Sequence, residues 1–152
     1  MLSSLDLHGN RIEATTMKDI VEAGISSIRT LNLSNNLLDS VAIGHLVKGP
    51  WLQLCDLQLH SALCGSIADC LALLSTGAWL QLKYLELGAN GVDVTAMSAL
   101  ARSKWPSLYS LHLPHNCLSS DNFRLMGGGA VDGEPRDICR KFWPKLCFLS
   151  YE

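Results

Sequence analysis

Few segments of this sequence carry residue types that could do chemistry. Residues 115–117 read His-Asn-Cys, the side chains of a cysteine-protease site, but that catalysis needs the three groups brought together across a fold rather than adjacent in the chain. The triple glycine at 127–129 suggests a phosphate-binding loop, yet the Gly-Lys-Ser/Thr ending is missing and no predicted strand leads into it. The six cysteines include no Cys-x-x-Cys pair. The sequence therefore predicts neither an enzyme nor a cofactor.

The secondary-structure elements that would position any functional group can be predicted from the pattern of leucines. Leucine supplies 28 of the 152 residues, and 48% of the chain is hydrophobic against 17% charged. The motif L-x-x-L-x-L-x-x-N-x-L begins at residues 2, 28, 54, 82, 108 and 146, with spacings of 26, 26, 28, 26 and 38 residues. The third copy has Ala62 where the asparagine belongs, and the sixth runs off the end of the chain at Tyr151. A fixed period of this length indicates a repeat architecture.

These repeats resemble the leucine-rich repeat family, specifically its ribonuclease-inhibitor-like class, in which a short strand alternates with a helix on the convex side. The resemblance implies an α/β leucine-rich repeat solenoid, with a parallel concave β-sheet and convex helices. Residues 1–152 would form one domain of five repeats plus the start of a sixth. Proteins with similar repeats include GTPase-activating proteins and innate-immune receptors, so a regulatory segment of either type is the alternative to a plain protein-binding module.

The residues of each repeat fit this fold on physical grounds. In x-L-x-L-x the two leucines point to one face of a strand and the x residues to the other, so one face is core and the other is exposed. The motif asparagine can satisfy backbone groups in the turn that leaves the strand, which Ala62 cannot do. The segments between strands space their apolar residues as helices do, and we expect helix N-caps at Thr15, Ser40, Ser66, Thr95 and Asp121.

Two further features are seen against this period: the tryptophans keep it and one insertion interrupts it. The four tryptophans each lie three residues before a repeat start, which predicts core side chains rather than a ligand-stacking site: Trp51, Trp79, Trp105 and Trp143. The 38-residue spacing contains an insertion at about residues 127–138, before the pattern resumes at Phe142. Its glycines and Pro135 predict an inserted surface loop.

The exposed strand residues form columns along the predicted concave face. They are polar and mildly acidic with a few aromatic residues, a mixture that suits protein recognition. The candidate partner-binding residues are Asp6, His8, Thr30, Asn32, Asp56, Gln58, His60, Tyr84, Glu86, Ser110 and His112. His8 and His60 share a column, but two repeats separate them by roughly 10 Å at about 4.8 Å per strand. That is too far to share one zinc ion, so no metal site is predicted.

The net charge and the cysteines limit which class of partner and which cellular compartment the sequence predicts. Lys+Arg 12 against Asp+Glu 14 gives a net charge of −2 with no basic half, which disfavours nucleic acid. No apolar run is long enough to span a membrane. The cysteines read as reduced thiols, which favours a cytoplasmic or nuclear protein. Because both terminal repeats lack polar caps, we expect either continuation into further repeats or end-to-end self-association.

Overall fold

The computed structural model describes residues 2–126 and 133–152, and strands alternate with helices along the chain. Each of the first four strands is followed by one helix, and the fifth is followed by two. In chain order the elements are β1 (Ser4–Asp6), α1 (Ala14–Glu22), β2 (Thr30–Asn32), α2 (Ser40–Leu46), β3 (Asp56–Gln58), α3 (Ile67–Leu74), β4 (Tyr84–Glu86), α4 (Val94–Leu100), β5 (Ser110–His112), α5 (Ser120–Met126), α6 (Pro135–Cys139) and β6 (Phe148–Ser150).

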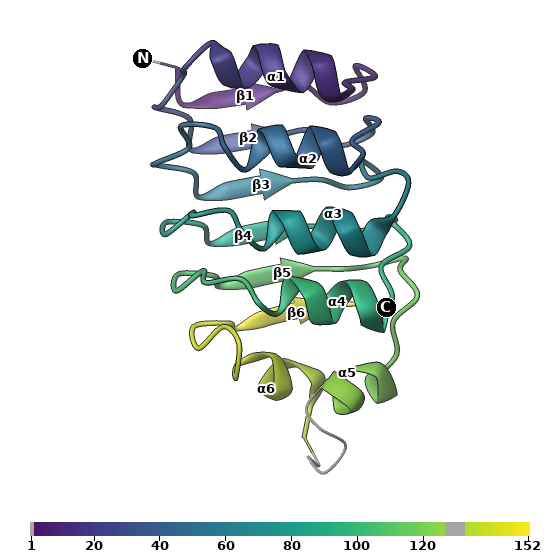
Figure 1. Ribbon diagram of the computed structural model, residues 1–152. Coiled ribbons are helices and arrows are strands. Elements are labelled where there is room, and N and C mark those ends of the chain that lie inside the picture. The colour runs from purple at the N-terminus through teal and green to yellow at the C-terminus, as the bar shows by residue number, and fades with distance from the viewer. Residues whose placement is uncertain (1, 127–132) are drawn as a thin grey trace.

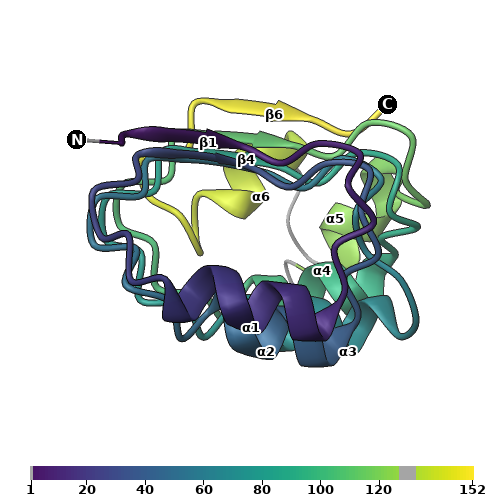
Figure 2. The ribbon, with the colours of Figure 1, turned by 90° about the horizontal axis from the view of Figure 1, so that it is seen from above.

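The six strands form one parallel sheet in the order β1-β2-β3-β4-β5-β6 (Figure 1). Viewed from above, the strands make one layer and helices α1–α4 the other (Figure 2). The register places the middle leucine of each strand beside its neighbours, in a row formed by Leu5, Leu31, Leu57, Leu85, Leu111 and Leu149. The molecule is therefore the predicted α/β solenoid, in which each repeat contributes one strand to the sheet and packs only on its neighbours.

The core lies between the two layers and contains all four tryptophans and most motif leucines, as predicted, whereas the first motif leucine, Leu2, is exposed. The rings of Trp79 and Trp105 stack with centroids 5.8 Å apart. Buried indole N–H groups need acceptors. That of Trp105 donates to the Gly77 carbonyl at 2.8 Å, and that of Trp143 to Ser103 Oγ at 2.8 Å. The tryptophans therefore bind one repeat to the next.

The motif asparagines form a buried ladder between repeats. The Asn90 amide Nδ2 donates to three carbonyls, and its Oδ1 accepts from two backbone N–H groups of the preceding repeat. The carbonyls are those of Leu59, Leu87 and Gly88, and the N–H groups are those of Ala62 and Leu63. Asn36 also donates to three carbonyls and accepts from two N–H groups. Asn116 donates to two carbonyls and accepts from two N–H groups. This confirms the backbone-satisfying role predicted for the asparagine.

Backbone pairing takes over where Ala62 replaces the asparagine. Leu38 and Leu63 form an isolated parallel β-bridge, in which the Leu38 N–H donates to the Ala62 carbonyl at 2.9 Å. The Cys64 N–H returns a bond of 3.1 Å to the Leu38 carbonyl. The second and third repeats therefore stay in register without an amide side chain between them.

The predicted loop at 127–138 is wrong for its last residues. Pro135–Cys139 is the helix α6, and its Ile138 and Cys139 side chains are fully buried in the core. Pro135 at the first helical position has no N–H to lose there, which favours starting a helix. Residues 127–132 of the predicted loop lie outside the described residues.

Four helices begin earlier than predicted. Asp39 and Asp93 cap α2 and α4 by accepting the N–H of Ala42 and Ala96, both at 2.8 Å, so Ser40 and Thr95 are not the caps. Glu13 precedes α1 and makes no side-chain cap bond, which places Thr15 inside the helix. Asp121 likewise lies within α5. Ser66 is a cap as predicted, accepting from the Asp69 N–H at 3.4 Å.

Candidate functional site

The concave face is the side of the sheet away from the helices, and its outward-facing positions form three columns. The outer column contains Ser4, Thr30, Asp56, Tyr84, Ser110 and Phe148. The middle column contains Asp6, Asn32, Gln58, Glu86, His112 and Ser150. The third column, just beyond the strands, contains His8, Ser34, His60, Gly88, Pro114 and Glu152. The parallel register sets each outer and middle residue beside its counterparts on the neighbouring strands.

Several middle-column side chains are occupied by bonds to their own backbone. Asp6 Oδ1 accepts the His8 N–H at 3.0 Å, and Asn32 Oδ1 accepts the Ser34 N–H at 3.0 Å. Glu86 Oε1 accepts the Gly88 N–H at 2.6 Å in the same way. These oxygens accept hydrogen bonds from backbone N–H groups that lie just after the end of each strand. They therefore have a structural role besides any contact with a partner.

Glu86 also lies 3.6 Å from His60 Nδ1 on the neighbouring repeat. A side chain at position 88 would displace this pair. A Cβ on Gly88 would lie 2.6 Å from Glu86 Oε1 and 2.8 Å from His60 Nδ1, both closer than van der Waals contact allows. The missing side chain in the third column thus makes room for the Glu86–His60 contact.

His112 is held between two serines. Its Nε2 lies 2.7 Å from Ser110 Oγ, and its Nδ1 lies 3.0 Å from Ser150 Oγ. A serine hydroxyl beside an imidazole is the geometry of a nucleophile and its base. However, Ser110 is only 3% exposed, in register between Tyr84 and Phe148, so a substrate could not reach its hydroxyl. Among the predicted binding residues, Ser110 is thus placed where it supports His112 rather than facing a partner.

A shallow hollow brings five of the predicted residues together on the concave face. It is lined by Asp56, Gln58, Tyr84, Leu85, Glu86 and His112. Gln58 Nε2 lies 3.4 Å from each carboxylate oxygen of Asp56. Burial raises the pKa of the Asp56 carboxyl above its ordinary value, and it outweighs the lowering effects of the Gln58 hydrogen bond and of nearby His112. The hollow does not include Asp6, His8, Thr30, Asn32, His60 or Ser110.

Three aromatic rings form an exposed cluster beside this hollow. The Tyr109 ring contacts Tyr84 with centroids 6.4 Å apart and Phe148 with centroids 5.3 Å apart, both edge to face. All three rings reach solvent, Phe148 with 57% of its surface exposed. Of these three residues, only Tyr84 was among the partner-binding residues predicted from the sequence. Phe148 shares the outer column with Tyr84, and that shared position was a signal for it.

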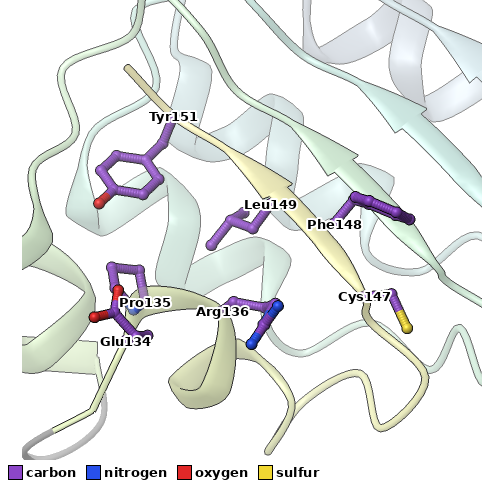
Figure 3. Close-up of a pocket in the computed structure, with 7 residues that line it drawn as sticks. All are labelled: Glu134, Pro135, Arg136, Cys147, Phe148, Leu149 and Tyr151. Carbon is purple, nitrogen blue, oxygen red and sulfur yellow. The ribbon is translucent and has the colours of Figure 1, made fainter.

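A second hollow lies between β6 and α6 (Figure 3). Leu149 and Tyr151 point toward α6, whereas Phe148 lies on the opposite side of the strand. The two charged residues that line this second hollow, Glu134 and Arg136, are of opposite sign. This hollow contains none of the predicted binding residues.

Comparison with known proteins agrees with this geometry. No model of a known protein family matches the sequence, and no curated protein matches it. Among solved structures, an internalin from Listeria monocytogenes str. 4b F2365 is similar, with a TM-score of 0.52 at 18% sequence identity. The aligned region covers 99% of this chain and 48% of the internalin chain. The chain has the leucine-rich repeat fold. At this level of identity the likeness shows the fold alone.

Grouped metal ligands, membrane-spanning helices and disulfides are also absent from the part of this leucine-rich repeat chain that the structure describes. Within residues 2–126 and 133–152, no three His, Cys, Asp or Glu side chains are grouped as metal ligands. Over the same residues, no helix combines the length and the apolar character needed to cross a bilayer. All six cysteines are free thiols in the structure.

The cysteines differ in exposure, and we expect their reactivity to differ accordingly. Cys70 and Cys139 are buried, and burial raises the pKa of their thiols to about 11 and about 12. Because the thiolate is the reactive form, only about one Cys70 in a thousand would be ionised at pH 8. Cys117 is exposed and should react first with a disulfide reagent. Native protein should therefore show one fast thiol and two that react only in denaturant, with the other three between them.

The Cys117→Ser variant is the control, since it should lose the fast phase alone. Rapid labelling of all six thiols in native protein would contradict the burial of Cys70 and Cys139. Fewer than six reactive thiols in denaturant without reductant would mean that disulfides form, against the reduced state inferred from the sequence.

Proposed function

We propose that this chain is a non-catalytic module that binds a partner protein through its concave face. The aromatic cluster of Tyr84, Tyr109 and Phe148 carries the proposal. Large rings exposed together on a sheet face gain most from being covered, and aromatic residues are enriched among the anchors of protein interfaces. The hollow beside the cluster adds polar groups that could fix the orientation of a partner.

We further infer that the repeats belong to the ribonuclease-inhibitor-like class. This is supported by convex helices of seven to nine residues in α1–α5. We also propose a cytoplasmic or nuclear location, which the free state of all six cysteines supports.

Site-specific photocrosslinking tests where the partner docks. A photoreactive benzophenone amino acid would replace Thr30 or Tyr84 on the concave face, and Val41 or Leu73 on the helical side as matched exposed controls. We expect partner crosslinks from the concave positions and few from the helical ones. The same crosslinked species from Val41 and Leu73 but not from the concave positions would overturn the proposal.

Loss of one aromatic anchor should weaken binding without unfolding the chain. Tyr84→Ala removes a ring that is 45% exposed, so its removal creates no core cavity. We expect partner affinity to fall by about 1 to 3 kcal/mol, or roughly 5- to 150-fold in Kd. Affinity would be measured with the crosslinked partner once purified. The control Leu52→Ala removes a more exposed apolar side chain away from the columns and should leave Kd unchanged.

A further inference from the structure

The three columns of the concave face are acidic. Their eighteen positions, all of which the structure describes, hold the carboxylates of Asp6, Asp56, Glu86 and Glu152 and three histidines, but no lysine or arginine. Arg29 and Lys83 lie just before the strands, at the register position of Tyr109. The chain as a whole has nearly as many basic as acidic residues, 12 against 14. A partner that covers this face would therefore gain from carrying positive charge.

Asp56 is less compensated than Glu86, the other carboxylate that lines the hollow. Glu86 has the Gly88 N–H and His60 beside it, whereas the Asp56 oxygens receive only long bonds of 3.4 Å from Gln58. None of the ion pairs among the described residues involves Asp56. The side chain is nevertheless half-buried, and that burial raises its pKa. The carboxylate has thus lost water without gaining an ion pair among the described residues, and nearby His112 only partly offsets that loss.

An aromatic ring adjoins this carboxylate. Tyr84 is the register neighbour of Asp56 on β4, and both residues line the hollow. A carboxylate and an aromatic ring at one site suit a guanidinium group. It can donate paired hydrogen bonds to the carboxylate and stack on the ring. Lysine offers a point charge with neither planar feature.

We propose that the concave face binds an extended, arginine-bearing segment of a partner protein, with the guanidinium in the hollow against Asp56 and Tyr84. This rests on the proposed function and names the chemistry of the partner. In an extended segment, side chains two residues apart lie on one face about 6.6 Å apart. The Tyr84 ring also belongs to the aromatic cluster, in which it contacts Tyr109. An apolar side chain two residues from the arginine can therefore cover Tyr109, whose ring centroid lies 6.4 Å from that of Tyr84.

A pair of peptides tests the charge directly. The probe is acetyl-Ser-Leu-Ser-Arg-Ser-Leu-Ser-amide, and its matched control replaces arginine with citrulline, which has nearly the same shape but no charge. Kd would be measured for each by NMR titration of the ¹⁵N-labelled chain. We expect the arginine peptide to bind about fivefold more tightly and to shift the amide signals of Asp56, Tyr84 and His112.

Variants then assign the preference to one carboxylate. Asp56→Asn keeps an oxygen for the Gln58 bond but removes the charge, so the arginine-to-citrulline preference should fall to about one. Asp6→Asn removes a carboxylate of the same face outside the hollow, and the fivefold preference should remain. Circular dichroism would verify that both variants fold. Equal binding of the two peptides to the unmodified chain, or a preference that survives Asp56→Asn, would overturn the proposal.

Failure of this inference is distinguishable from failure of the proposed function. A partner that crosslinks to the concave positions and depends on Tyr84, but whose Kd is unchanged by Asp56→Asn, would leave the proposed function standing and overturn the arginine assignment. Crosslinks confined to the helical side would overturn both.

Discussion

Replacing Asn90 with alanine should destabilise the chain by about 3 to 5 kcal/mol. The Asn90 side chain makes five hydrogen bonds to backbone groups of two repeats and is itself 6% exposed. Alanine would leave several of those N–H and carbonyl groups buried without partners, and each costs about 1 to 3 kcal/mol unless the turn relaxes or water enters. Urea unfolding followed by circular dichroism would measure the loss in free energy of unfolding.

The chain provides a matched control at the same motif position. Asn10 is exposed, and its side chain donates one bond of 3.1 Å to the His8 carbonyl. Asn10→Ala should therefore cost less than about 0.5 kcal/mol. Equal losses for the two variants would show that the ladder of amide bonds between repeats is not what makes the motif asparagine important.

The repeat period predicted the sheet and the core because it reports side-chain burial directly. Leucines at alternate positions can be buried together only if each strand turns the same face inward. That condition fixed the row containing Leu31, Leu57 and Leu85, as the register confirms. The tryptophans followed because an indole repeated at one position of a solenoid must occupy equivalent places between layers.

The period says less where a feature depends on neighbours across the sheet. Ser110 was expected to be exposed because it occupies an outward position, but the residues on both adjacent strands are large aromatics and Ser110 lies buried between them. The β-bridge beside Ala62 is likewise a property of two repeats. No single motif copy contains the information that Leu38 and Leu63 meet.

Local elements shorter than the period were also hard to predict. The helix α6 has five residues, too few for apolar spacing to distinguish it from a loop. The turn after each of the first five strands contains a left-handed residue just before the motif position of asparagine, namely Gly9, Asn35, Ser61, Ala89 and His115. Glycine and asparagine favour that conformation, but alanine does not, so the turn at Ala89 is imposed by the surrounding repeats.

Adjacent residues of β4 should respond oppositely to truncation, because their side chains lie on opposite faces of the sheet. Leu85 is 0% exposed and lies in the leucine row between Leu57 and Leu111. Leu85→Ala would leave a cavity and should cost about 2 to 5 kcal/mol, a fall in Tm on the order of 10 °C for a domain of this size. Tyr84→Ala should lower Tm by no more than about 3 °C. Calorimetry of both variants would test this. Equal losses would mean that Tyr84 supports the fold as much as Leu85 does, and the weaker partner binding of Tyr84→Ala could then not be assigned to lost contact.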